Sequence, residues 1–244
     1  MSETVIRSIT PAISIFSVPF KRFGLMKIGG RSTAVKLANN DIFIIPSSPL
    51  GEDVKAEIAR LGGQVKYLVA PDFEHTMFTK VYSKEYPSAL CIGPEGVDTK
   101  IPEVKWAGTY KTNGLAGADE KFGYEDEIET CYFKSHANKD IAFLHKPSKT
   151  LIEADLLFNL PCPEQGIPAG GLFGFMNISP GGAAHRGVVS MVSSADKKLY
   201  GQSAAIVAGW DFDRIIPCHG AVIETGGKEA WVSTNKNVID AASA

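Results

Sequence analysis

The chain has 244 residues, of which 44% are hydrophobic, and a formal net charge of −2 at pH 7. A chain of this length buries roughly 70–75% of its unfolded surface, so its core needs no disulfide or structural metal for support. The four cysteines are widely spaced without a CxxC pair, which argues against zinc knuckles, thioredoxin chemistry and a disulfide framework and favours a reducing cytoplasm. Because no basic cluster is present, we expect no nucleic-acid partner.

The N-terminal region does not predict a membrane or secretory segment. The apolar residues 11–19 are bracketed by prolines and preceded by Glu3 and Arg7, which does not fit a secretory signal. No later stretch approaches the roughly 20 apolar residues that a membrane span requires. We therefore expect a cytoplasmic protein without a membrane partner.

The first part of the chain predicts a mixed sheet with helices outside it. Residues 13–18 alternate in polarity as a strand does, and residues 32–46 predict a hairpin that turns at Asn39, Asn40 and Asp41. Residues 51–61 predict a helix with one apolar stripe, and residues 65–69 predict a strand. The order hairpin, helix, strand is typical of such a sheet.

The remaining elements predict a second hairpin system. We expect a helix over residues 76–86, a strand over 89–92 and irregular structure over 98–123. Three strands are expected over 128–133, 141–145 and 151–155, a helix within 188–208 and a last strand that ends before His219. Glycine and proline dominate residues 161–187, which predicts a long loop over the site that Asp155 helps to form. No repeat or linker is visible, so residues 1–244 are expected to form a single domain.

Three of these strands end in acids or histidines. The first is followed by the run Ala70-Pro71-Asp72-Phe73-Glu74-His75, the second ends at Asp155, and the third is followed by His219. Chemistry in α/β proteins concentrates at strand ends, so we expect these side chains to converge on one metal. The candidates also have plainer interpretations: His75 as a helix-start residue and Asp155 as the cap of a strand. His136, among polar residues before the strand over 141–145, is a further candidate whose plainer interpretation is a solvated turn residue.

This order of motifs resembles the metallo-β-lactamase fold superfamily, in particular a poorly characterised branch whose HxHxDH motif is degenerate. The resemblance implies an α/β fold, an αββα sandwich of two mixed sheets flanked by helices. The family motif falls on Ala70, Asp72, Glu74 and His75, its third histidine on His136, its bridging aspartate on Asp155 and its last histidine on His219. Ala70, Asp72 and Glu74 thus stand at positions where the family has other ligands.

The resemblance implies two half-sites for metal. One retains Asp72, His136 and Asp155, and the other retains Glu74, His75, Asp155 and His219. The second set is the more complete, so we expect one divalent ion there, with a weaker second ion in the first set as an alternative. Three carboxylates in one cavity would repel one another without a cation. The ligand types leave Zn²⁺, Mn²⁺ and Fe²⁺ open.

The expected function is that of a metal-dependent hydrolase in which a metal-bound hydroxide attacks a small-molecule ester, lactone, thioester or phosphoester. Asp155 would anchor the metal and orient the water. Asp72 would be a ligand or the proton acceptor, and His136 its partner or a donor to substrate. Two alternatives stay open: a ligand-binding or scaffold protein that has lost catalysis, and a lyase or isomerase with a single metal.

Three further residues carry separate expectations. His145 lies beside a hairpin turn and is expected to be exposed. His185 lies in or beside the long loop, where it would touch substrate or simply pack. Cys218 is expected in the core, on the sheet face opposite His219, because neighbouring strand residues alternate.

Overall fold

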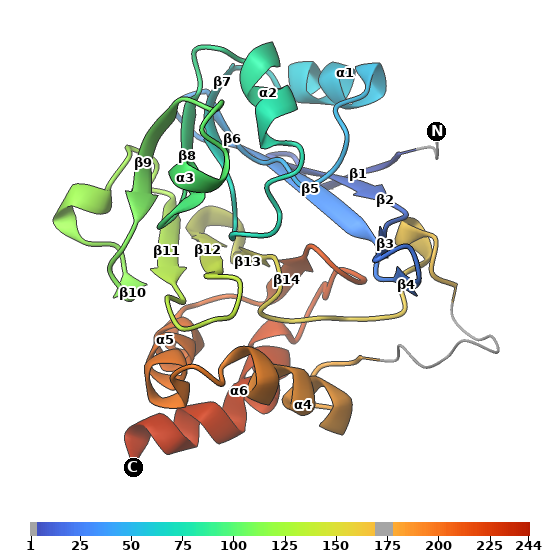
Figure 1. Cartoon of the computed structure of the whole chain (residues 1–244). Helices are drawn as coiled ribbons and strands as arrows, with labels where there is room; N and C mark the ends of the chain where they lie inside the picture. The colour runs from blue at the N-terminus through green and yellow to red at the C-terminus, as the bar shows by residue number, and fades with distance from the viewer. Residues whose placement is uncertain (1–3, 169–177) are drawn as a thin grey trace.

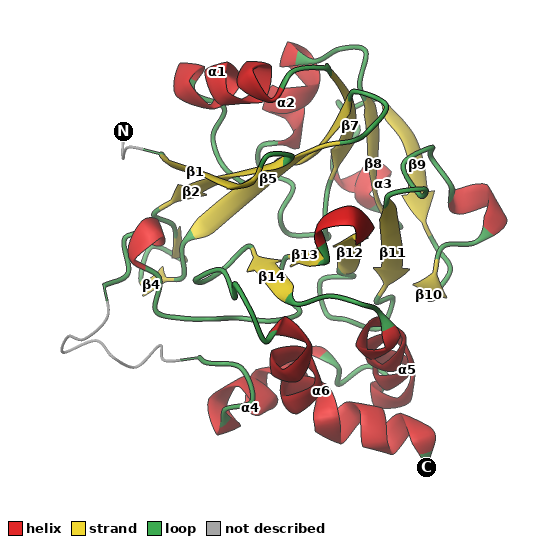
Figure 2. Cartoon of the chain, turned by 180° about the vertical axis from the view of Figure 1, so that it is seen from behind, coloured by secondary structure: helices red, strands yellow, loops and turns green. Residues whose placement is uncertain are grey.

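The computed structural model describes residues 4–168 and 178–244, which build four layers (Figure 1). Two sheets pack face to face, helices α1 and α2 cover the outer face of the first, and helices α4 to α6 cover the outer face of the second. Figure 2 shows the same layers from behind. The predicted αββα sandwich is confirmed.

The first sheet has seven strands in the spatial order β1 (Val5–Thr10), β2 (Ile13–Val18), β5 (Gly30–Lys36), β6 (Asp41–Ile45), β7 (Gln64–Val69), β8 (Leu90–Pro94) and β9 (Trp106–Tyr110). The pairs from β1 to β6 are antiparallel and those from β6 to β9 are parallel. The predicted mixed sheet is therefore present. A small hairpin of β3 (Lys21–Arg22) and β4 (Met26–Lys27) extends between β2 and β5.

The second sheet has five strands in the order β10 (Gly114–Leu115), β11 (Ile128–Tyr132), β12 (Ile141–His145), β13 (Thr150–Glu153) and β14 (Arg214–Pro217). Only β13 and β14 are parallel, so their carboxyl ends meet at one edge. The helices are α1 (Glu52–Leu61), α2 (Thr79–Glu85), α3 (Val97–Lys100), α4 (Ala183–Val192), α5 (Lys197–Gly209) and α6 (Gly227–Ser243).

Local sequence explains the first elements. Helix α1 buries Val54, Ile58 and Leu61 on one face, with acids in its first turn where the helix dipole favours them. The β5–β6 hairpin turns at Asn40, whose φ of 66° is the left-handed conformation that asparagine tolerates. Both elements agree with the sequence prediction.

Apolar side chains form three buried groups that match the layers. One group lies between the sheets and includes Phe43, Tyr67 and Phe143. The other two lie between each sheet and its helices, where Val54 and Tyr82 pack on the first sheet and Trp231 packs on the second. This close packing leaves the strand ends and their loops as the places where polar groups gather.

Three expectations require correction or limits. Residues 98–123 are not irregular, because they contain β9, β10 and a 3₁₀ helix over Ala118–Glu120, and β9 is an edge strand of the first sheet. His145 is not exposed: only 2% of it is accessible, and its Nδ1 lies 2.7 Å from the hydroxyl of Ser148. The expected loop over residues 161–187 contains a 3₁₀ helix, Pro163–Gln165, and the start of α4, while residues 169–177 lie outside the described part.

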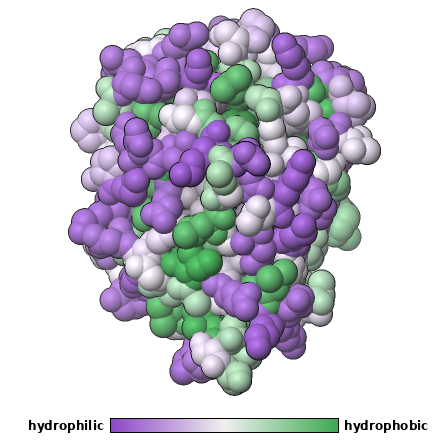
Figure 3. Space-filling model, turned by 90° about the vertical axis from the view of Figure 1, so that its left-hand side faces the viewer, coloured by the Kyte–Doolittle hydropathy of each residue, from purple (hydrophilic) through white to green (hydrophobic). Residues whose placement is uncertain are grey.

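The surface is mainly polar on the face that Figure 3 presents, where hydrophobic residues form small separate patches. Across residues 4–168 and 178–244, no helix combines the length and the apolar character needed to cross a membrane.

Candidate metal centre

Four loops meet at one edge of the sandwich, and each follows a strand. They are the segments after β7, between β11 and β12, after β13 and after β14. Backbone hydrogen bonds join them: Phe73 N–H donates to Asn138 O at 2.8 Å, and Cys218 N–H donates to Glu153 O at 3.0 Å. These bonds bring residues that are up to about 150 positions apart in the sequence into one cluster, as the convergence of parallel strand ends predicts.

Asp72 holds His75 in a defined orientation. One carboxylate oxygen of Asp72 accepts the backbone N–H groups of Glu74 (2.8 Å) and His75 (2.6 Å). The other oxygen lies 2.7 Å from Nδ1 of His75, which therefore carries the proton and donates it. Burial disfavours the charged form of His75, but attraction by Asp72, Cys218 and Asp155 prevails and raises the pKa of His75 well above its ordinary value. The same pairing lowers the pKa of Asp72 against the opposing effect of burial.

His219 is oriented by a backbone group. Its Nδ1 donates to the carbonyl oxygen of Gly29 at 2.8 Å, which fixes the proton on Nδ1 and leaves a lone pair on Nε2. Burial lowers the pKa of His219 to about 4, so the ring is neutral at pH 7. Only 2% of this residue is accessible.

The two rings face each other through their remaining nitrogens. Nε2 of His75 lies 2.8 Å from Nε2 of His219, and the ring centroids are 4.9 Å apart. Since both Nδ1 atoms are already donors, two neutral rings would place two lone pairs against each other. A positive charge must therefore lie between the rings, either as a second proton on His75 or as a bound cation.

Asp155 places a carboxylate oxygen beside the ring of His219. One of its oxygens lies 3.4 Å from Nε2 of His219, and the other accepts from the side chain of Asn138 at 2.5 Å. The backbone N–H of Asp155 donates to Asp140 at 2.7 Å. One oxygen of Asp155 thus lies beside the Nε2 atom of His219, which itself faces Nε2 of His75. Two ring nitrogens and a carboxylate oxygen are ligand types that suit a divalent cation.

Cys218 also reaches this cluster. Its Sγ and a ring nitrogen of each of His75 and His219 lie within 4.8 Å of one another, as do atoms of Asp72, His75 and Asp155. The prediction that Cys218 points away from His219 is wrong. Strand β14 ends at Pro217, so the alternation of a strand no longer applies one residue later.

Glu74 and His136 occupy different positions from those expected of ligands. Glu74 is exposed and its carboxylate lies 3.4 Å from Nζ of Lys100, so the structure places it outside the cluster. His136 is buried beside the cluster, but its Nδ1 accepts the backbone N–H of Asn138 at 3.0 Å. Its Nε2 therefore carries the proton and has no partner among the described residues. His136 presents a donor here, whereas a metal requires a lone pair.

The turn that carries His219 is held by buried polar side chains. Arg31, which is 1% accessible, donates from Nη1 to Pro217 O at 2.6 Å and to Gly220 O at 2.7 Å. Gln165 donates to Cys218 O at 2.8 Å and accepts Gly220 N–H at 2.7 Å. The segment after β13 thus contacts the site through Gln165, a residue that no sequence motif indicates.

Two buried acids beneath the cluster were also missed. Asp140 is completely buried, and burial together with the charges of Asp72 and Asp155 raises its pKa well above the ordinary value. Glu153 accepts the N–H groups of Leu156 and Leu157, and burial followed by repulsion from Asp140 raises its pKa as well. In the sequence, only the positions of Asp140 and Glu153 near His136 and Asp155 indicate that these acids lie at the site.

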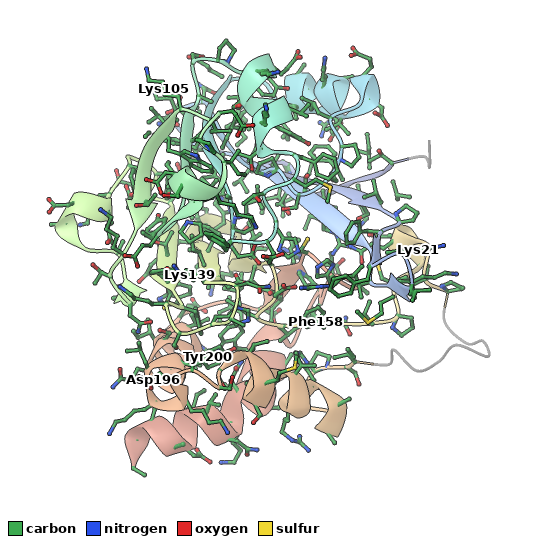
Figure 4. All side chains as sticks on the ribbon, in the orientation of Figure 1. Lys21, Lys105, Lys139, Phe158, Asp196 and Tyr200 are labelled. Carbon is green, nitrogen blue, oxygen red and sulfur yellow. The ribbon has the colours of Figure 1, made fainter. Side chains whose placement is uncertain are left out.

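His185 lies in helix α4 and packs in the interior of the protein. It is fully buried, and its Nε2 accepts the backbone N–H of Phe158 at 3.2 Å. The Phe158 ring stacks on His219 with centroids 5.6 Å apart and planes 7° apart. Figure 4 shows Phe158 between the sheets and the helix layer below them. His185 thus contacts Phe158, and Phe158 in turn stacks on the ring of His219.

Solved structures share this architecture along almost the whole chain. The VMB-1 structure determined at pH 5.5 has a TM-score of 0.63 at 12% identity, with 99% of each chain covered. The metallo-β-lactamase DIM-1 exposed to ceftazidime has a TM-score of 0.62 at 14% identity, with 98% of each chain covered. The metallo-β-lactamase FIM-1 from Pseudomonas aeruginosa, in its mono-zinc form, has a TM-score of 0.60 at 10% identity, covering 99% of this chain and 97% of that one. No protein-family model and no curated protein matches the sequence.

Proposed function

Because the chain has the metallo-β-lactamase fold, we propose that it is a metal-dependent hydrolase whose divalent ion is held by His75, His219 and Asp155. The observation that carries this proposal is the 2.8 Å approach of the two Nε2 atoms, each on a ring whose Nδ1 already donates. Ligand histidines in metal sites have their second nitrogen bonded to a carboxylate or a carbonyl in this way. Asp72 and Gly29 supply those two partners.

The donor set supports one ion rather than two. Ala70 is fully buried and has no side-chain donor, and the Nδ1 of His136 is already an acceptor for Asn138. Both oxygens of Asp72 are engaged with the segment that holds His75. The half-site that the resemblance placed at Asp72, His136 and Asp155 therefore has fewer free lone pairs than the other, because three donors already occupy the carboxylate of Asp72 and Nδ1 of His136 is an acceptor for Asn138.

Each side chain of the site would have a separate role in the proposed hydrolysis. A bound divalent ion would act as a Lewis acid and would lower the pKa of a water molecule toward neutrality. Asp155 would hold one oxygen toward that water while Asn138 fixes the other. Asp72 would orient His75 and keep its proton on Nδ1, which makes Asp72 a positioning residue. His136 would offer its Nε2 proton as a donor beside the site.

We propose a small molecule with an ester, lactone, thioester or phosphoester bond as substrate. The test begins with protein purified without chelators. We expect elemental analysis to find about one divalent ion per chain, and a panel of these substrates to show turnover that a chelator removes and added metal restores. The variant His219→Ala should lose both the ion and the turnover, and Glu74→Gln should keep both.

A folded wild-type protein that binds none of Zn²⁺, Mn²⁺ and Fe²⁺ would contradict this proposal. Stoichiometric metal without turnover of any substrate would instead favour a ligand-binding protein. Products formed without the addition of water would favour a lyase or isomerase.

A further inference from the structure

We propose that the β3–β4 hairpin, residues 20–27, docks the protein on an anionic membrane surface, with its apolar tip in the lipid interface and its cations at the headgroups. This role goes beyond the proposed hydrolase function and does not depend on the metal centre. The expectation of no membrane partner rested on the lack of a spanning segment, whereas a protein that docks on the surface needs none.

The tip of the hairpin exposes apolar side chains. Leu25 is 86% and Phe23 79% accessible, the highest values among the large hydrophobic residues that the structure describes, and Phe20 and Met26 are exposed beside them. A single apolar residue at a surface needs no explanation, but four within residues 20–26 concentrate apolar surface on one small element. Such concentrations mark sites that contact a partner or a membrane.

The backbone at the tip does not favour phenylalanine. Phe23 has a φ of 52° and Gly24 a φ of 72°, both in the left-handed region, and Leu25 N–H donates to Arg22 O at 3.2 Å across the turn. Glycine and asparagine adopt this conformation readily, whereas a bulky residue does so at a cost in free energy. Because the ring of Phe23 is exposed, packing in the core does not offset that cost. A strained and exposed aromatic residue therefore indicates a functional constraint.

Three cations flank the apolar tip, and the sequence has no acid between residues 19 and 31. Lys21 lies directly opposite Lys27 in the register of the two strands, where like charges repel. Arg22 lies over the Phe23 ring, 5.3 Å from its centroid. Every lysine or arginine ion pair found across residues 4–168 and 178–244 involves other cations. An anionic surface would relieve the repulsion between the two lysines.

An anionic bilayer fits this combination better than a protein partner does. A stable protein interface covers roughly 800 Å² and about 20–30 residues on each partner. The hairpin offers only residues 20–27. At a bilayer, a few apolar side chains enter the boundary between headgroups and acyl chains while lysine and arginine stay at the headgroups. Each such cation raises the affinity for an anionic surface about fivefold.

The base of the hairpin adjoins the candidate metal centre. The backbone N–H groups of Ile28 and Gly29 both donate to Phe20 O at 3.1 Å, and Gly29 O accepts from Nδ1 of His219. Figure 4 shows Lys21 at the outer margin of the fold. A protein docked through this hairpin would therefore hold the metal centre near the lipid surface.

The test measures co-sedimentation of the full chain with vesicles of phosphatidylcholine, either alone or with about one-third phosphatidylserine. We expect binding that requires phosphatidylserine and weakens at high salt. Lys21→Ala should lower the affinity about fivefold. Lys105→Ala is the matched control, because Lys105 is also an exposed lysine but lies at another margin of the fold in Figure 4, and it should bind as the wild type does.

Two further variants test the apolar tip. Phe23→Asn should weaken vesicle binding without lowering the melting temperature, because asparagine accepts the left-handed φ. The four native cysteines are buried, so a polarity-sensitive dye would label the Leu25→Cys variant at position 25. Its emission should shift to shorter wavelength with the anionic vesicles. Leu115→Cys, at an exposed leucine in β10, should show no shift.

Failure of the wild type to bind the anionic vesicles at low salt would overturn the membrane role. Equal losses in Lys21→Ala and Lys105→Ala, or a dye at position 25 whose emission does not shift, would also overturn it. Self-association that Phe23→Asn abolishes, in a protein that binds no vesicles, would assign the hairpin to a second copy of the chain instead. Metal content and turnover test the hydrolase proposal separately, because no hairpin residue is a proposed ligand.

Discussion

His75 and His219 point their Nε2 atoms at each other across 2.8 Å, although 144 residues separate them in the chain. Each ring is held from behind, His75 by the Asp72 carboxylate and His219 by the Gly29 carbonyl. Two lone pairs facing each other require a positive charge between them, and in the metal-free protein the raised pKa of His75 supplies it as a proton. Metal binding and the loss of that proton are therefore linked.

The Asp72–His75 pair predicts that replacing the carboxylate of Asp72 by an amide weakens metal binding. In Asp72→Asn the side-chain oxygen can still accept backbone N–H groups, but its NH₂ group would face Nδ1 of His75 and favour a proton on Nε2. We expect Zn²⁺ affinity to fall by about 10–100-fold, as for other outer-shell partners. Competition with a chromophoric chelator measures this loss. Glu74→Gln, the same chemical change two residues away, should leave affinity unchanged, and equal losses in both variants would refute the assigned roles.

Asp140 predicts a pH dependence of stability. Its pKa in the folded protein is raised above the ordinary 3.8, so the folded state keeps a proton that the unfolded state has already lost. The free energy of unfolding of the metal-free protein should therefore fall as pH rises from about 4 through that raised pKa, by at most about 1.4 kcal/mol per pH unit for one group. Asn cannot titrate, so Asp140→Asn should make this slope shallower. Urea unfolding between pH 4 and 8 measures this pH dependence in both proteins. If Asp140→Asn has the same slope as the wild type, the pH dependence comes from other groups, and Glu153 is the first of these to test.

Arg31 predicts a large loss of stability on truncation. Arg31→Ala would leave Pro217 O and Gly220 O without a donor, at about 1–3 kcal/mol for each unsatisfied buried group. We expect the free energy of unfolding to fall by about 2–5 kcal/mol and metal affinity to fall with it, because these carbonyls flank His219. Arg7→Ala is the control, since Arg7 is a half-exposed arginine that also pairs with Glu164. Its loss should cost no more than about 1 kcal/mol.

Gly220 predicts a conformational effect on the same turn. Its φ is +120°, and a Cβ there would lie 2.4 Å from the backbone oxygen of Asn159. Gly220→Ala should therefore shift the turn, lower metal affinity and reduce the melting temperature. Gly187→Ala is the contrasting substitution, because its Cβ would meet nothing within 4 Å and alanine favours the α4 helix. A melting temperature for Gly220→Ala at or above that of the wild type would show that the turn tolerates a side chain.

The sequence determined the elements whose signals are local. The apolar stripe of α1, the asparagine turn between β5 and β6, and the strands that precede Ala70 and His219 were all predictable, because periodicity and turn residues act within a few positions. The order of acids and histidines at strand ends also indicated the fold and the convergence of the site. By contrast, β9 was missed because its edge position leaves its residues only partly buried, with a weak pattern.

Only the tertiary structure decided which side chains face the centre. Glu74 and Asp72 are two residues apart, and the turn that Asp72 closes with its own carboxylate directs Glu74 outward toward Lys100. Cys218 faces the histidines because the chain leaves the strand at Pro217 and is then held by Arg31 and Gln165, which come from distant segments. Such orientations depend on contacts between loops that are remote in sequence, and no periodicity in one segment encodes them.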